Sequence, residues 1–172
     1  MKKSDIQIEL GYYKDYVALV ENLPIREALE KYTAGIQNPD KEVLNRLEGK
    51  VYAPGKWTVK EILQHLIDWE RIFSYRALVY ARNDGGITAG HDQDIMAANC
   101  NANSKTLDEI LDDFIAARKS TISLFRSFDA IDLLQTGESF NMKMNPLAMG
   151  FIILGHQIHH FNVINERYLP LL

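Results

Sequence analysis

The sequence is nearly free of cysteine, with Cys100 as the single example among 172 residues. One thiol cannot close an intramolecular disulfide or supply the thiolates of a zinc finger, so a bound metal would take nitrogen and oxygen ligands. No neighbouring base or predicted helix start would activate Cys100, so we expect no nucleophile there. Scarce cysteine is typical of the reducing cytoplasm, where we expect this protein.

A run of basic residues is also missing. Lys and Arg number 19 against 23 Asp and Glu, which gives a net charge of −4. Phosphate-binding surfaces need clustered positive charge, so we expect no nucleic-acid partner. The first residues, MKKSDIQIELGYY, contain no apolar stretch typical of a secretion signal, and the most apolar segment, PLAMGFIILG, is too short to cross a bilayer. We therefore expect no membrane partner.

Alternation of apolar and polar residues, the pattern of a half-buried strand, does not occur over any length. Apolar residues instead recur at helical spacing, and the length suits one domain spanning 1–172. The periodicity and the helix-breaking residues predict a short helical lead followed by four long helices, at about 12–20, 24–37, 59–82, 107–128 and 146–168.

Local capping signals support three of the predicted helix starts. The sequences TVKE and TLDE are capping boxes that begin at Thr58 and Thr106, and Asn145 is a good N-cap before Pro146. The segment 85–104 is rich in Gly, Asn and Asp, although DIMAANC within it can form one or two helical turns. Connections of this length are often functional, and four amphipathic helices with unequal connections predict an all-α four-helix bundle.

Three histidines occur within five positions in the sequence GHQIHH. His156 and His160 are four residues apart, which on a helix is about 40° of rotation and about 6 Å of rise, so both imidazoles can reach one ion. They continue the apolar stripe of their helix, whereas His159 lies off that face. His65, in ILQHLIDWE, interrupts the apolar stripe of the second long helix in the same way.

A histidine on an apolar face is most often a satisfied core residue, and this remains the alternative for each of the three taken alone. An i, i+4 pair together with a third inward histidine favours a site for a divalent metal, with His65, His156 and His160 as ligands. Three neutral imidazoles leave coordination positions open, as in a catalytic site. Zinc and nickel both suit such nitrogen ligands.

Motifs along most of the chain resemble the DinB-like superfamily, named for damage-inducible proteins. They are YAPGKWTVKEILQHLIDWERIFSYRAL, GHDQD and GHQIHHFNVINERYL. The resemblance implies a bundle of up-down-down-up course with a long crossover after the second helix. It also implies a metal bound by one histidine of that helix and an H-x-x-x-H pair of the last, here His65, His156 and His160. Similar members tend to have an aromatic residue where this chain has His91, which is either an extra ligand or acid or, as we favour, a loop residue.

The reaction is less defined than the site. A metal with open positions can activate water or bind a thiolate, and the resemblance implies a hydrolase or a transferase that uses a low-molecular-weight thiol on a small-molecule substrate. It also favours a homodimer. A metal-binding stress-response module and a metal-free helical interaction protein are the alternatives to an enzyme.

Helper residues are candidates from their spacing alone. Asp68 lies one turn after His65, where it is either a catalytic residue that orients an imidazole or acts as a general base, or a solvated carboxylate. Arg167 lies seven residues after His160 and can hold an anionic substrate group. We favour instead a favourable interaction of Arg167 with the helix C-terminus.

Overall fold

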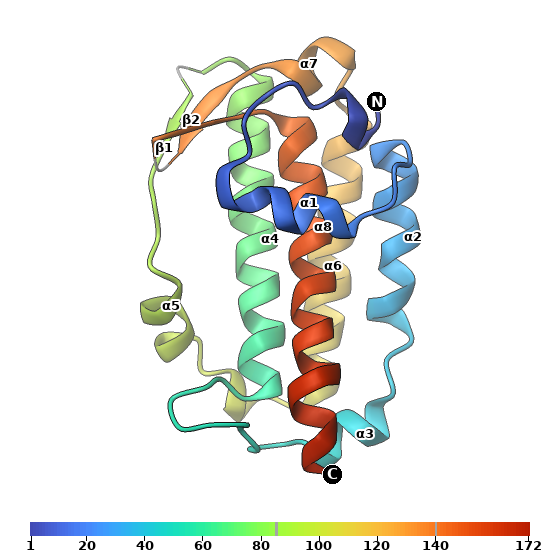
Figure 1. The fold of residues 1–172 in the computed structure, drawn as a ribbon, viewed down its shortest axis with the longest axis vertical. Helices are drawn as coiled ribbons and strands as arrows, with labels where there is room; N and C mark the ends of the chain where they lie inside the picture. Colours follow the sequence, from blue (N-terminus) through green and yellow to red (C-terminus); the bar gives the residue numbers. More distant parts are fainter. Residues whose placement is uncertain (85, 140) are drawn as a thin grey trace.

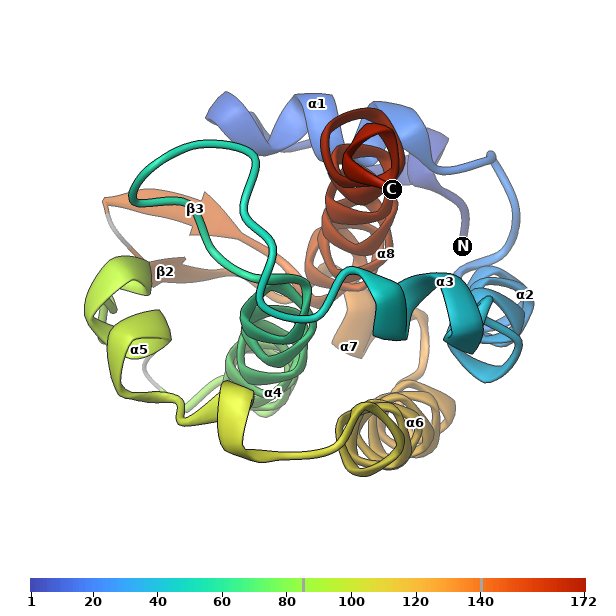
Figure 2. The ribbon, with the colours of Figure 1, turned by 90° about the horizontal axis from the view of Figure 1, so that it is seen from below.

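Four long helices form a bundle in a computed structural model that describes residues 1–84, 86–139 and 141–172 (Figure 1). They are α2 (Ile25–Gln37), α4 (Val59–Ala81), α6 (Leu107–Arg126) and α8 (Pro146–Val163). Helix α4 packs against α6 and α8, and α2 packs against the same two helices (Figure 2). The prediction of an all-α four-helix bundle is confirmed.

The course of the chain through the bundle is up-down-down-up. Helices α2 and α8 run in one direction, and α4 and α6 run in the other (Figure 1). Because α4 and α6 are parallel, the chain must return along the whole bundle between them. This crossover carries β1 (Ile87–Thr88), α5 (Gln93–Asn99) and a 3-10 turn (Ala102–Ser104). Helix α5 lies largely within the segment DIMAANC, where one or two helical turns were expected.

The helices begin at the predicted capping signals. Thr58 Oγ1 accepts a hydrogen bond from the backbone N–H of Glu61, whose carboxylate accepts from the N–H of Thr58, so a complete capping box begins α4. A second box begins α6 at Thr106. The Asn145 side chain caps α8 by accepting from the N–H of Ala148 at 2.8 Å. These local bonds define where each helix begins and therefore how its side chains are placed along the bundle.

Short elements that the periodicity did not predict lie at the ends of the bundle. They are α3 (Lys41–Arg46), α7 (Ala130–Leu134) and a sheet in which β2 (Gly137–Ser139) pairs in parallel with β1 and antiparallel with β3 (Met142–Met144). Strands of two or three residues are too short to show an alternating pattern. The ring of Tyr80 packs so close to Gly137 that a Cβ there would lie 2.0 Å from it. Tertiary packing, rather than a local signal, therefore forms this sheet.

Helix α1 (Lys14–Leu19), inside the predicted lead, crosses α8 on the outside of the bundle (Figure 2). The crossing is close because Gly155 of α8 has no side chain, and a Cβ there would lie 1.9 Å from the carbonyl oxygen of Tyr16. Glycine at this position brings Tyr16 against the histidine segment of α8.

Helix α8 is the most apolar helix and the centre of the core. Residues Pro146–Leu171 contain an 18-residue window that is apolar enough to cross a membrane by length and composition alone, but 67% of this window is buried inside the bundle. Helices α1, α2 and α4 all pack against α8. Its histidines lie between two apolar clusters, one that includes Leu154 and one that includes Ile164. The apolar composition of α8 is therefore explained by the core.

Candidate metal centre

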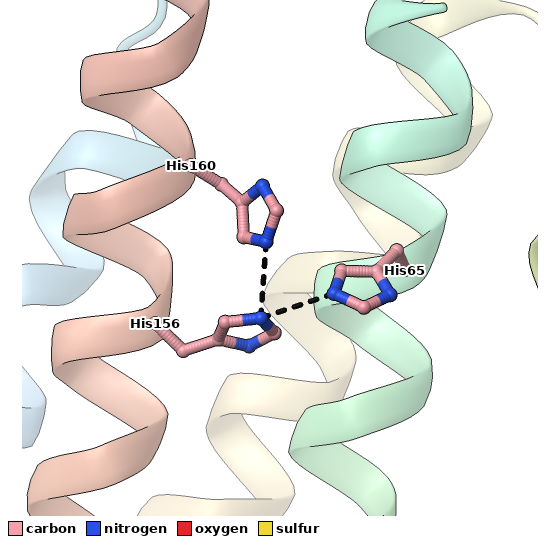
Figure 3. A group of neighbouring side chains, drawn as sticks. All are labelled: His65, His156 and His160. Carbon is pink, nitrogen blue, oxygen red and sulfur yellow. Dashed lines mark hydrogen bonds between the residues drawn. The ribbon is translucent and has the colours of Figure 1, made fainter. Parts of the chain in front are cut away.

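Three histidine side chains from α4 and α8 point toward one another inside the bundle (Figure 3). His65 and His156 are buried, and His160 is half-buried. The Nε2 atom of His156 lies 3.0 Å from Nε2 of His65 and 3.1 Å from Nε2 of His160. All three candidate ligand atoms lie within 4.8 Å of one another. The structure thus brings together the three residues that sequence spacing indicated as ligands.

The three imidazoles cannot satisfy one another by hydrogen bonding alone. A ring nitrogen carries either a hydrogen or a lone pair, so Nε2 of His156 can complete a hydrogen bond to one of its two neighbours but not to both. A cation accepts a lone pair from all three nitrogens at once. Two nitrogens bound tetrahedrally to zinc at about 2.1 Å are separated by about 3.4 Å, which lies between the separations of 3.0 and 3.1 Å from His156 and the 4.8 Å within which all three atoms lie. The donor set therefore fits a divalent metal.

Burial keeps the candidate ligands neutral at physiological pH. It lowers the pKa of His65 to about 4 and, together with repulsion from His65, lowers the pKa of His160 to about 3. Burial also lowers the pKa of His156 well below its ordinary value, with smaller contributions from the other two imidazoles. Neutral imidazole is the form that binds metals, so these side chains are ready to bind without first losing a proton.

Aromatic side chains surround the cluster. Trp57 packs against His65 with ring centroids 4.7 Å apart. Tyr16 of α1 and Phe73 of α4 contact His156, with centroids 5.3 and 6.4 Å from its ring. Apolar walls of this kind limit the access of water and strengthen the interaction of a bound ion with its ligands.

A cleft of about 260 Å³ opens beside His160. The loop that contains Tyr52 and Trp57 forms one wall, and Gln93 and Asp94 at the start of α5 form another. The cleft is slightly smaller than the range of about 300–1,000 Å³ that is usual for small-molecule sites, and it reaches one of the three candidate ligands. The crossover thus contributes two residues to the lining of the cleft, and a functional role for this connection stays a prediction.

Asp68 is bonded to neighbours other than the histidines. Its Oδ1 accepts from Nε2 of Gln64 at 2.9 Å and lies 3.9 Å from a guanidinium nitrogen of Arg71. Burial raises the pKa of Asp68, opposed by the Gln64 hydrogen bond and the charge of Arg71. Among the described residues no hydrogen bond joins Asp68 to an imidazole. Its catalytic role stays a prediction.

The other polar residues put forward from the sequence lie around the cleft or away from it. His91 is exposed, two residues before the lining residue Gln93, in agreement with the favoured interpretation as a loop residue. His159 lines the cleft and packs on Tyr16 with ring centroids 5.2 Å apart. Arg167 is exposed in the π-helical turn Ile164–Tyr168 that follows α8.

A second buried polar cluster was missed in the sequence. Arg118 of α6 donates from Nε and Nη2 to the Glu70 carboxylate at 2.7 and 3.0 Å, and from Nη2 to Oε1 of Gln157 at 2.8 Å. The amide of Gln157 in turn donates to the carbonyl oxygen of Tyr32 at 3.1 Å. This network joins all four long helices. The signal that could have found it is the position of Arg118, one helical turn after the core residue Phe114.

Comparisons with known proteins identify the family and the fold. The family model of the DinB superfamily matches residues 11–164. Among solved structures, the chain is similar to YfiT from Bacillus subtilis, described as a probable metal-dependent hydrolase with an unusual four-helix bundle topology. The TM-score is 0.72 at 13% sequence identity, over 96% of this chain and 90% of that one, so the likeness concerns the fold. A search of curated proteins finds no match.

Proposed function

The chain belongs to the DinB superfamily, and from this membership and the geometry of the three histidines we propose that it is a metal-dependent enzyme. His65, His156 and His160 are the proposed ligands of one divalent ion, zinc or nickel. The observation that carries the proposal is the convergence of three neutral Nε2 atoms whose lone pairs cannot all be used by hydrogen bonds within the cluster.

The residues around the proposed ligands would have different roles in such a site. When bound, a divalent ion supplies a Lewis acid that lowers the pKa of a water or a thiol and polarises a carbonyl group. Trp57 and Phe73 hold the imidazoles in place and limit the access of water. His160 lies at the edge of the cleft, where a small-molecule substrate would bind between the 52–57 loop and α5.

Two reactions would use this arrangement. One is hydrolysis of a small substrate by an activated water, and the other is transfer of a low-molecular-weight thiol to such a substrate. Activity that requires added thiol would indicate the second. A homodimer and a cytoplasmic location also stay predictions, which light scattering and cell fractionation would test.

Metal stoichiometry tests the proposed ligands directly. Untagged protein is dialysed, reloaded with zinc or nickel, and measured by elemental analysis for the wild type and for His65→Ala and His160→Ala. His91→Ala is the matched control, because His91 is an exposed histidine outside the cluster. We expect about one ion per chain in the wild type and the control, and loss of that ion in the two cluster variants.

Circular dichroism of each variant shows whether the bundle is intact. Loss of metal in folded His65→Ala and His160→Ala supports the proposal. Metal content that is negligible in the folded wild type after reloading, or equal in all variants, would overturn it. The protein would then be a helical bundle with buried structural histidines.

A further inference from the structure

Two opposite charges line the cleft beside His160, one on each of two walls. Lys56 belongs to the loop that forms one wall, and Asp94 lies at the start of α5, which forms another. Among the described residues that line the cleft, Lys56 is the only lysine or arginine and Asp94 is the only residue with a carboxylate. Both residues are exposed, so their charged groups are accessible to a molecule in the cleft.

The chain leaves Lys56 without an ion-pair partner. No carboxylate oxygen of the described residues lies within 4.0 Å of its ammonium group, and the recorded contact of Nζ is with the ring of Tyr52, 5.9 Å from the centroid. The neighbouring lysines in the chain are bonded, since Lys50 donates to a backbone carbonyl oxygen at 2.8 Å and Lys60 pairs with Glu48. The ammonium group of Lys56 therefore remains available at the cleft.

Asp92 and Asp94 have different roles at the start of α5. The carboxylate of Asp92 caps the helix by accepting from the backbone N–H groups of Asp94 and Ile95 at 2.9 and 3.0 Å. No ion pair joins the carboxylate of Asp94 to another described residue. An aspartate in the first turn also interacts favourably with the helix dipole, which is the alternative role for Asp94. The cap is complete without Asp94, so its carboxylate is available at the cleft.

Aromatic side chains form much of the remaining lining. Tyr52 and Tyr168 meet edge to face with ring centroids 5.3 Å apart, and Trp57 lines the cleft beside His160. The hydroxyl group of Tyr168 donates to the backbone carbonyl oxygen of Trp57, which fastens the loop to the turn after α8. These rings offer contacts to the carbon chain of a ligand. A volume of about 260 Å³ fits a molecule the size of a single amino acid better than a drug-sized ligand.

We propose that the substrate of the metal centre carries an amino-acid group, with its carboxylate bound by Lys56 and its ammonium group bound by Asp94. The inference rests on the proposed function, because it places the reacting end of the substrate at the three histidines. One positive and one negative residue on two walls complement a dipolar group, whereas a singly charged ligand would meet one like charge. The aromatic rings then contact the carbon chain between the amino-acid group and the reacting end.

Hydroxamates test the proposal, because a hydroxamate group binds zinc and can carry different charged ends. Glutamate γ-hydroxamate carries both charges, glutarate monohydroxamate lacks the ammonium group, 4-aminobutyrate hydroxamate lacks the carboxylate, and butyrohydroxamate lacks both. All four share the zinc-binding group on a three-carbon chain, so their affinities for the zinc-loaded full chain, measured by calorimetric titration, differ only through the charged ends. We expect glutamate γ-hydroxamate to bind about fivefold more tightly than either singly charged compound, the effect of one partly exposed ion pair.

Two substitutions assign each charge to its residue. Lys56→Met should weaken binding of glutamate γ-hydroxamate and glutarate monohydroxamate about fivefold without weakening that of 4-aminobutyrate hydroxamate. Asp94→Asn should weaken binding of glutamate γ-hydroxamate and 4-aminobutyrate hydroxamate by the same factor without weakening that of glutarate monohydroxamate. Lys119→Met and Asp112→Asn are the matched controls, because they remove the same charges from exposed positions of α6, outside the described lining of the cleft.

Equal affinity of the zinc-loaded wild type for the four hydroxamates would overturn the proposal, and this comparison needs no variant. Uniform weakening of all four by Lys56→Met or Asp94→Asn would also overturn it, because the residue would then act on the shape of the cleft. Equal weakening in the matched controls would overturn it as well, since the effect would be one of net charge. Both replaced side chains are exposed, so we expect circular dichroism to show folded variants.

Failure of this inference is distinct from failure of the metal site. Folded protein that holds one zinc but binds all four hydroxamates alike, or none of them, would retain the proposed function and lose the amino-acid assignment. Folded protein that holds no zinc after reloading would overturn the proposed function and, with it, the substrate assignment that rests on it.

Discussion

Two polar clusters are buried between α4 and α8, and they differ in how their hydrogen-bonding groups are used. In the network of Glu70, Arg118 and Gln157, opposite charges meet in paired hydrogen bonds, and Nη1 of Arg118 is its buried group that lacks a partner among the described residues. In the histidine cluster, uncharged rings direct their Nε2 atoms at one another. His156 and Gln157 are adjacent in the chain, so neighbouring residues of one helix serve the two clusters.

This difference indicates that the network of Glu70, Arg118 and Gln157 is structural, whereas the histidine cluster fits a bound metal ion. A buried ion pair holds helices together when its members satisfy each other, and removing one member leaves an unpaired charge in the core. Neutral imidazoles can be buried at lower cost, but their converging lone pairs remain available. Substitutions in the first cluster should therefore lower the free energy of unfolding, and substitutions in the histidine cluster should abolish metal binding. Four experiments test this distinction.

The largest effect on stability is expected from Arg118→Met. It leaves the Glu70 carboxylate buried without its cation, so we expect the free energy of unfolding to fall by about 3–5 kcal/mol in urea denaturation of metal-free protein. Arg126→Met is the control, since Arg126 pairs with Glu30 at the surface and should change stability by about 0–1 kcal/mol. Similar small losses in both variants would show that the buried network does not stabilise the fold.

Metal binding should stabilise the wild type and not a variant of the histidine cluster. Free zinc at about one hundred times its dissociation constant should raise the free energy of unfolding by about 2.7 kcal/mol. His156→Leu should show no such increase, while its metal-free form stays folded because leucine suits the apolar surroundings. A zinc-dependent increase that persists in His156→Leu would contradict the assignment of this ligand.

The metal-free protein should lose stability as the pH falls. Burial lowers the folded-state pKa of His65 to about 4, below its ordinary value of 6.5, so the unfolded state binds more protons between these values. The stabilisation is complete above pH 6.5 and decreases toward pH 4, by an amount on the order of 2 kcal/mol. His65→Leu should reduce the slope without abolishing it, because the pKa values of His156 and His160 are lowered too, and His91→Ala should preserve it, as measured by denaturation across this range. An unchanged slope in His65→Leu would exclude His65 as the cause.

The smallest effect on stability and metal binding is expected from Asp68→Asn. The Asp68 side chain is partly exposed and bonded to Gln64, so we expect a change of about 0.5 kcal/mol or less and nearly unchanged zinc affinity. If Asp68 acts as a general base once a substrate is known, turnover should fall by about 100-fold or more at the same metal content. A large loss of zinc affinity would instead show that Asp68 orients a ligand.

Much of the fold could be predicted because its signals are local. The capping boxes at Thr58 and Thr106 and the Asn145-Pro146 start place three helices within a residue of their observed beginnings. The short strands could not be predicted in this way. Their formation depends on the crossover lying beside Gly137 and on the ring of Tyr80 packing against it, which are contacts between distant parts of the chain.

The four long helices and the candidate ligands could be predicted from the sequence, because apolar periodicity and capping are local signals and a four-residue spacing places His156 and His160 on one face of any helix that contains them. The packing of the helices places His65 opposite this pair and Arg118 on the Glu70 carboxylate, and it leaves Arg76 without a carboxylate partner among the described residues. Helical spacing is a local property, whereas partners on different helices are set by how the helices pack. That packing pairs Arg118 with a buried carboxylate, whereas Nε of Arg76 has no hydrogen-bond partner among the described residues.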